Sequence, residues 1–193
     1  SYRYLAGSVE QFFANGGTRC YIARVVAPGA CAASASKGIV HIRAANEGIW
    51  GNRIRIHIAS SAKKKIQLLE KAGENAYRAK NADGFMEGDT VVFGTEYNRI
   101  ASIFDDVITF AVPFTDDPVD AGLVPKKLLY LVETDIQVRY GDEVEEYAGV
   151  SFNVASPDYI MHRLKKSELV SISVEAADKY DNSVNQIFED GRM

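Results

Sequence analysis

The chain has 193 residues, of which 47% are hydrophobic and 25% charged, and its formal net charge is −4 at pH 7. This length suits one domain, or one core domain with a smaller insert. The acidic balance argues against a broad footprint for DNA or RNA and leaves only a local basic patch open. No apolar run approaches the roughly 20 residues of a membrane-spanning helix, and Ser1–Ala6 lacks the pattern of a secretion signal.

The first expected element is a short amphipathic helix. Val9, Phe12 and Phe13 lie at helical spacing, which gives the helix one apolar face. Ser8 and Gln11 have the spacing of a capping box, so we expect the helix to begin near Ser8.

A glycine stop, a strand and a loop are expected next. Asn15 and Gly16 tolerate the left-handed conformation that ends many helices. The run Cys20–Val26 is apolar on both faces, which predicts a buried strand in a sheet covered on both sides. Pro28–Lys37 is small and polar, and it is typical of a flexible loop.

Two further strands are expected on either side of a turn bracketed by glycines. Ile39–Ala44 predicts a short strand, and Gly48–Asn52 predicts the turn. Arg53–Ile58 alternates basic and apolar residues, which indicates a half-buried strand with a basic outer face. Trp50 is either a contact point for a partner or a ring packed under the turn, and the position favours packing.

Residues 63–125 have the pattern of a small inserted β domain. Lys63–Lys65 reads as a solvated junction, and Gly73–Asn75 divides the next stretch, which favours two strands over one helix. Arg99–Ile103 and Val107–Val112 predict a hairpin across Asp105–Asp106. We expect a meander or partial barrel. Three prolines, Pro113, Pro118 and Pro125, should end it, because proline cannot donate to a strand ladder.

Core elements are expected to resume after this insert. Leu128–Tyr140 predicts a strand, and Val144–Val154 predicts its antiparallel partner across the Gly141–Asp142 turn. Ser156, followed by proline, predicts the start of a helix. Leu169–Val174 alternates as a final strand.

These elements together predict an α+β fold. The expected core is a mixed or antiparallel sheet flanked by helices, with an inserted small β-rich domain of meander or barrel type. We assign residues 1–62 and 126–180 to the discontinuous core, 63–125 to the insert and 181–193 to a tail or linker.

The sequence contains none of the common phosphate-binding, dinucleotide-binding or nucleophile-elbow motifs. His41, His57 and His162 lie far apart in sequence; the first two could face each other across paired strands, but a metal would need more ligands. Cys20 and Cys31 have no zinc spacing. A disulfide between them is one alternative, and free thiols in a reducing compartment are the favoured one.

Acidic residues gather in three clusters, Asp105–Asp106, Asp116–Asp117 and Asp142–Glu146. Paired carboxylates can perform acid–base chemistry or bind calcium. Each cluster lies at an expected turn or strand edge, where carboxylates favour turn geometry and keep edges soluble. We therefore expect no catalytic, cofactor-binding or metal-binding residues, and no enzymatic activity.

Several motifs follow one another in a fixed order. The first two are FFANGGTRCYIARV, residues 12–25, and GIWGNRIRIHI, residues 48–58. Together they resemble the signature of contractile tail sheath proteins, found in phages and in related injection machines. The matching residues are Phe13, Asn15, Gly16, Gly17, Tyr21, Arg24, Val25, Gly48, Trp50, Gly51 and Asn52. Later stretches with the family's order are Ile136–Gly141, Glu145–Tyr147, Ser156–Ile160 and Ser167–Val170.

The resemblance implies a structural subunit that polymerises helically around a tail tube and contracts to drive the tube through a target envelope. The implied partners are other sheath subunits, together with tube and baseplate proteins reached through regions largely absent here; neither nucleic acid nor membrane insertion is implied. The implied location is the virion tail, and the host cytoplasm during assembly. Family members are usually much longer and nothing after Val174 resembles their last domain, so we expect an internal fragment.

Two other classes of function stay open. The loops around Asn81–Gly94 and Asp105–Asp106 are compatible with a surface-exposed module that recognises a carbohydrate or a host receptor. An enzyme that uses the acidic clusters is the third class, which the scattered placement of histidine, serine and carboxylate residues disfavours.

Overall fold

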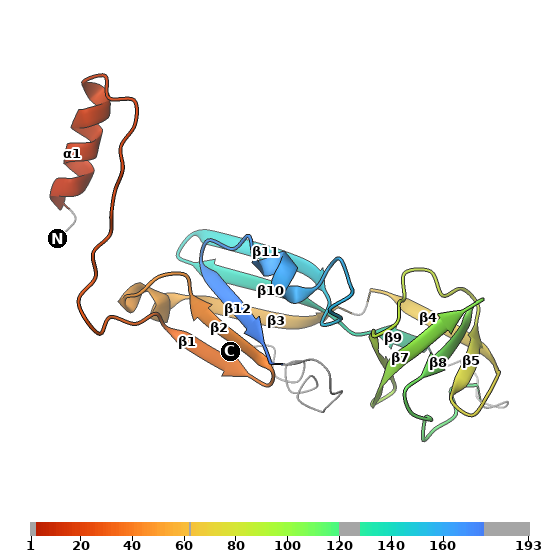
Figure 1. The fold of residues 1–193 in the computed structure, drawn as a ribbon. Helices are drawn as coiled ribbons and strands as arrows, with labels where there is room; N and C mark the ends of the chain where they lie inside the picture. The colour runs from red at the N-terminus through yellow and green to blue at the C-terminus, as the bar shows by residue number, and fades with distance from the viewer. Residues whose placement is uncertain (1–2, 62, 120–127, 176–193) are drawn as a thin grey trace. The chain divides into compact units, whose positions relative to one another are not determined.

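The computed structural model describes residues 3–61, 63–119 and 128–175 (Figure 1). The described part of the chain is mostly β, with 44% of it in strands. In the described ranges only two short α-helices occur, α1 (Arg3–Ala14) and α2 (Ile160–Leu164). The expected α+β fold class is therefore wrong, because no layer of helices flanks the described sheets. The chain divides into two compact units, Ser1–Ala30 and Cys31–Met193.

Helix α1 begins earlier than the sequence suggests. Ser8 lies inside the helix, and its hydroxyl donates a hydrogen bond to the carbonyl of Tyr4 at 2.7 Å. A serine that bonds back to the preceding turn cannot cap the helix start. The expected capping box of Ser8 and Gln11 is therefore wrong.

The end of α1 is the glycine stop that the sequence predicts. The amide of Gly17 donates to the carbonyl of Phe12 at 2.9 Å, and the amide of Gly16 donates to that of Phe13 at 3.1 Å. Gly16 has a φ of +88°. These two bonds and the left-handed glycine are the Schellman motif, which satisfies the last carbonyls of the helix.

The segment Cys20–Val26 after this stop forms no strand. It belongs to none of the described sheets, and Tyr21 and Val25 are 85% and 92% exposed. The expectation of a buried strand is wrong for this chain. A strand needs a neighbour for its backbone groups and cover for its faces.

The second unit contains two three-stranded antiparallel sheets. Their strand orders are β1-β2-β12 and β11-β10-β3. In chain order the strands are β1 (Ser34–Lys37), β2 (Val40–Ala44), β3 (Arg55–Ser61), β10 (Glu133–Tyr140), β11 (Glu143–Val150) and β12 (Val170–Val174). Pro28–Lys37 was expected as loop throughout, but its last four residues form β1.

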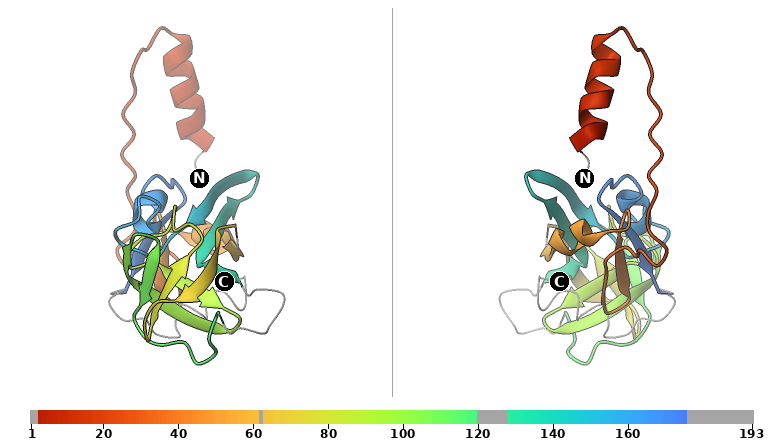
Figure 2. Two further views of the ribbon diagram at one scale, coloured as in Figure 1. Left: turned by 90° about the vertical axis from the view of Figure 1, so that its right-hand side faces the viewer. Right: turned by 90° about the vertical axis from the view of Figure 1, so that its left-hand side faces the viewer.

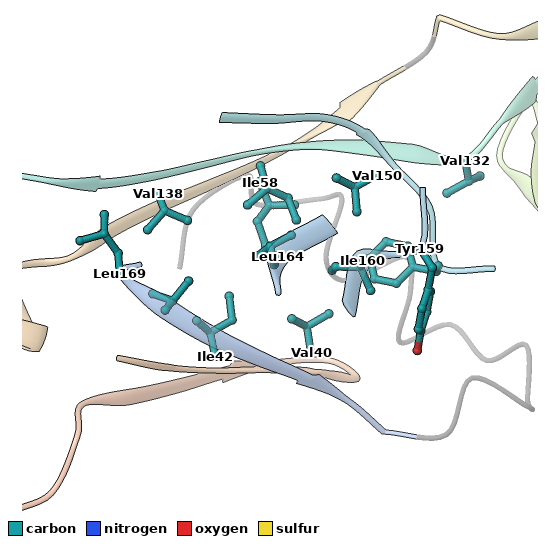
Figure 3. Packing of buried hydrophobic residues seen from close by; sticks show 13 residues of the cluster. Val40, Ile42, Ile58, Val132, Val138, Val150, Tyr159, Ile160, Leu164 and Leu169 are labelled. Atoms are coloured by element: carbon teal, nitrogen blue, oxygen red, sulfur yellow. The ribbon is translucent and has the colours of Figure 1, made fainter. Parts of the chain in front are cut away.

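One apolar core lies between the two sheets. Figure 3 shows Val40 and Ile42 of β2 pointing toward Ile58 and Val138 of the opposite sheet, and α2 contributes Leu164 between them. Alternation along each strand produces this arrangement, because every second side chain faces the partner sheet. The two sheets with their shared core are called the sandwich below.

The turn before β3 is a short 3-10 helix, η1 (Ile49–Arg53), and Gly48 before it has a φ of +122°. The Trp50 ring packs edge-on against Tyr140, with 5.3 Å between ring centroids, and its Nε1 donates to the carbonyl of Glu47 at 3.2 Å. The packing interpretation of Trp50 is therefore confirmed.

Six strands between the sandwich strands β3 and β10 form a closed barrel, whose yellow and green strands face the viewer in the left view of Figure 2. Around the barrel the order is β4-β5-β8-β7-β6-β9. The strands are β4 (Lys65–Lys71), β5 (Ala76–Ala79), β6 (Thr90–Phe93), β7 (Glu96–Phe104), β8 (Val107–Phe110) and β9 (Leu128–Leu131).

A separate aromatic core fills the barrel. Phe114 packs against Tyr77, Phe93 and Phe110, with ring centroids 6.2, 5.8 and 4.9 Å away. The preferred two strands at 66–80 are confirmed as β4 and β5, and so is the hairpin of β7 and β8. Full closure removes the exposed sheet edges that a meander would leave.

Two expectations near the end of the chain need correction. Leu128–Tyr140 is not one strand: β9 belongs to the barrel and β10 to the sandwich, and the amide of Val132 between them bonds to the carbonyl of Thr90 at 2.9 Å. The helix expected from Ser156 begins only at Ile160, because Ser156 forms a turn instead. Pro125 and the expected tail at 181–193 lie outside the described residues.

Candidate functional site

The acidic clusters have structural roles in the folded chain. Asp105 and Asp106 have φ values of 48° and 59°, as the two central residues of a type I′ hairpin turn require. A carboxylate oxygen of Asp106 also accepts the amide of Ala82 at 2.9 Å. Asp117 accepts the Lys71 ammonium at 3.2 Å. The turn geometry and these bonds give Asp105, Asp106 and Asp117 a structural role at turns and strand edges.

Glu145, in the third acidic cluster, holds the turn before β12. Its carboxylate accepts the Ser167 hydroxyl at 2.6 Å, the Glu168 amide at 2.8 Å, the Tyr147 hydroxyl at 2.9 Å and the Leu169 amide at 3.3 Å. Burial opposes its ionisation, but these donors together hold the pKa of Glu145 below its ordinary value. The group is therefore a charged anchor for the chain rather than a poised acid.

The histidines do not converge. His41 lies in β2 and His57 in β3, and these strands belong to different sheets, so the idea that they face each other across paired strands is wrong. The His162 ring packs against Tyr159 instead, with 5.4 Å between centroids. The described residues contain no group of three or more His, Cys, Asp or Glu side chains able to hold a metal.

One polar constellation escaped the sequence analysis. The hydroxyl of Ser36 lies 2.7 Å from Nδ1 of His41, and Nε2 of His41 lies 3.0 Å from a carboxylate oxygen of Glu175. Ser36 and His41 are direct partners across the hairpin of β1 and β2, which the two-residue turn at Gly38 could have indicated. Glu175 directly follows β12, far from the other two residues in sequence, and no sequence signal connects it to Ser36 and His41.

The order of hydroxyl, imidazole and carboxylate is that of an acyl-transfer triad. However, Ser36 is exposed on an edge strand, and the side chain of Glu175 is 74% exposed. Electrostatic catalysis of this kind depends on a water-excluded site with fixed donors. We therefore interpret the three residues as a polar contact that joins neighbouring strands.

A buried polar junction connects the barrel to the sandwich within the second unit. Asp89 is 4% exposed and accepts the Asn153 amide at 2.7 Å and the Met86 amide at 2.9 Å. Burial raises the pKa of Asp89. Beside it, Lys64 donates to the buried carboxylate of Glu133 at 2.8 Å, and this bond raises the pKa of Lys64. The junction fixes where the two cores meet.

A small cavity of about 190 Å³ opens between the two sheets of the sandwich. Ile42, Ile54, Ile56 and Val170 line it together with polar residues such as Ser34 and Asn52. No titratable side chain lines it, so the cavity offers no acid, base or nucleophile for a reaction.

Most of the large apolar side chains exposed among the described residues lie in the N-terminal arm, which we define as residues 3–30. Leu5, Phe12 and Phe13 of α1 are each more than two-fifths exposed. Tyr21 and Val25 of the extended segment are exposed far more. Covering one such side chain contributes roughly 1.5–3 kcal/mol, so the arm favours association strongly. We identify the arm as the candidate functional site, a site of interaction rather than of catalysis.

Both cysteines are free and exposed, Cys20 in this arm and Cys31 just after it. The idea that Cys20 is buried in a strand is therefore wrong, and the alternative of a disulfide between Cys20 and Cys31 is not seen in this structure. The described residues include no helix long and apolar enough to cross a membrane.

Comparisons with known proteins add no relative. No family model matches the chain, no curated protein matches it and no solved structure resembles it. Inferences about function therefore depend on the residues themselves and on the ordered motifs of the sequence.

Proposed function

We propose that the chain is part of a structural subunit of a contractile tail sheath. In this role the protein polymerises helically with other copies around a tail tube, and contraction drives the tube through a target envelope. The partners are other sheath subunits, with tube and baseplate proteins reached by regions outside this chain. It works in the virion tail after assembly in the host cytoplasm, and it is not an enzyme.

The observation that carries this proposal is the coincidence of the motif series with the exposed arm. The first motif, residues 12–25, includes the glycine stop and the apolar segment that the chain leaves uncovered. A subunit that works by assembly needs surfaces that are completed by other polypeptide. Contacts between unlike surfaces that do not close into a ring generate helical polymers, as a sheath requires.

The test is electron microscopy of the full-length product of the gene that encodes this chain. Expressed alone and viewed in negative stain, it should form helical tubes or polysheaths. Soluble monomers at every salt concentration and pH would contradict the proposal.

A second candidate is a binding module for surface carbohydrates, and one residue of the barrel favours it. Phe104 is 83% exposed next to the tight turn of the β7–β8 hairpin. Exposed aromatic rings are common contact points for ligands that offer an apolar face. A glycan array should then show binding that Phe104→Ala abolishes and Ile49→Ala, at an exposed site of the sandwich unit, leaves unchanged. An array without binding removes this candidate.

A further inference from the structure

The outer face of the sheet β11-β10-β3 carries two arginine side chains next to each other. Arg55 of β3 and Arg139 of β10 are direct partners in the antiparallel register, and both are exposed. Direct partners of this kind point to the same face, with Cβ atoms about 4.5–5.5 Å apart. The next pair along, Ile56 and Val138, packs in the core of the sandwich, so the arginine side chains lie on the solvent side.

This arginine pair has no acidic partner among the described residues. Within the described ranges, no hydrogen bond or ion pair joins the Arg139 side chain to another group. In the same ranges Arg55 reaches only the carbonyl of Ile54, the residue before it, to which its Nη1 donates at 3.5 Å. Both guanidinium groups therefore keep most of their donors available for a ligand.

Two carboxylates of the same sheet face are bound to other groups. Glu146, in the next row, accepts the Gln137 amide at 2.8 Å. Asp135 accepts the Lys63 ammonium at 3.1 Å and the Gly149 amide at 2.8 Å. Neither carboxylate forms an ion pair with the arginines, so the charge of the pair is not neutralised by them.

The arginine pair by itself destabilises the sheet, because like charges directly opposite each other weaken a pair of strands. Composition does not force this placement, since the chain has more acidic than basic residues, 26 against 22. Two exposed basic residues nearby, His57 of β3 and Arg53 just before β3, add no opposite charge. An anion bound by both guanidinium groups removes the repulsion and gives the placement a function.

The charge and the donors of the pair favour one class of anion. The two guanidinium groups carry two positive charges and present two planar forks of N–H donors. A carboxylate has a single negative charge and is satisfied by one arginine fork. A phosphate monoester carries a charge of about −1.5 to −2 at pH 7 and three acceptor oxygens, so it matches both forks at once. A nucleic acid fits less well, because its affinity comes from many phosphate contacts.

We propose that Arg55 and Arg139 form a binding site for a single phosphate group, carried by inorganic phosphate or by a monoester of a small molecule. The site lies on the outer face of one sheet of the sandwich and uses no residue of the N-terminal arm or of the barrel. It goes beyond the proposed sheath function and does not depend on it.

Nuclear magnetic resonance of the 193-residue chain tests the proposal through the Nε–Hε signals of the arginines. Inorganic phosphate, glycerol 1-phosphate and acetate are titrated separately at about pH 7, with the ionic strength held constant by chloride. We expect saturable shifts of the Arg55 and Arg139 signals with phosphate. A response to one phosphate compound alone identifies the source, and a response to both shows that the group itself is recognised. Signals that saturate with neither phosphate compound, or that respond equally to acetate, overturn the proposal.

Two substitutions and a matched control assign the binding to the pair. Arg55→Gln and Arg139→Gln should each weaken phosphate binding at least about tenfold, because each removes one charged fork. Arg43→Gln, at an exposed position of β2 in the other sheet, should leave the affinity unchanged. Full affinity in both variants of the pair, or an equal loss in the control, contradicts the proposal.

The thermal midpoint separates a binding role from a structural one. Without phosphate, Arg139→Gln should keep or raise the midpoint of the chain, because it removes a like charge opposite Arg55. Phosphate should raise the midpoint of the wild type and not that of this variant. A midpoint that falls on substitution would mean that the arginine stabilises the sheet, against the proposal. None of these readouts requires tubes, so failure of the sheath proposal is distinguishable from failure of this one.

Discussion

Single polar residues fix how parts of the second unit pack against each other, which apolar packing alone would specify less closely. Asp89 and Asn153 come from the barrel and the sandwich, and each satisfies a buried polar group of the other. Glu145 performs a similar task between β11 and the turn that precedes β12. A buried carboxylate without its partner is costly. These contacts therefore favour one packing arrangement over others more than they add to the free energy of unfolding.

Removing the Asn153 amide should weaken the junction between the two cores. We expect Asn153→Ala to lower the free energy of unfolding by about 1–3 kcal/mol, because Asp89 stays buried and loses one of its two donors. Urea denaturation followed by fluorescence measures this loss. Asn46→Ala, at an exposed loop position, serves as the matched control and should change stability by less than about 0.5 kcal/mol. Equal effects of the two substitutions would refute this role for Asn153.

Glu145 should make stability depend on pH on the acid side. Its pKa is lower in the folded chain than in the unfolded chain, so its contribution is complete above the unfolded pKa and is lost as pH falls through the folded pKa. The difference in unfolding free energy between the wild type and Glu145→Gln should therefore shrink as the pH is lowered from 6 toward about 3. A difference that stays constant over this range would show that charge is not what Glu145 contributes.

At the scale of whole elements, the sequence predicts local structure wherever neighbours along the chain determine it. The turn at Asp105–Asp106, the glycine stop at Gly16 and the strand that became β2 all depend on local conformation or on simple alternation. The errors come from long-range partners. Cys20–Val26 has the composition of a buried strand, but composition cannot supply the sheet that would bury it.

The remaining errors have the same physical origin. Leu128–Tyr140 is one continuous strand by pattern, and only closure of the barrel determines that it breaks at Val132. The fold class was misjudged because α1 and α2 were expected to cover a sheet, and neither helix forms a layer in the described residues. In the polar contact of Ser36, His41 and Glu175, the hairpin turn at Gly38 could have indicated the first pair, but no sequence signal connects Glu175 to them.

The exposed arm should be the part of the chain most open to proteases. Brief digestion of the 193-residue chain should cut between Ala14 and Cys31, because these residues belong to no helix or strand and most of them are exposed. The remaining fragment should keep the thermal midpoint of the intact chain, since both apolar cores lie after Cys31. A fall of several degrees after cleavage would mean that the arm stabilises the second unit and would contradict this division.

At the scale of the whole molecule, the chain combines a well-packed unit with an arm that is incomplete by itself. The unit has two cores, a barrel and a sandwich, joined by a buried polar junction. The arm presents large exposed apolar side chains, among them Tyr21 and Val25. A protein that functions through assembly fits this combination, because its apolar surfaces are completed outside the unit.

Electron microscopy of the full-length gene product, purified without other tail proteins, tests the sheath proposal most directly. We expect tubes whose images give the layer lines of a helical lattice, because identical subunits with unlike contacting surfaces assemble into open helices. Monomers under all conditions, or closed rings without helical order, would contradict the proposal that this chain belongs to a contractile sheath.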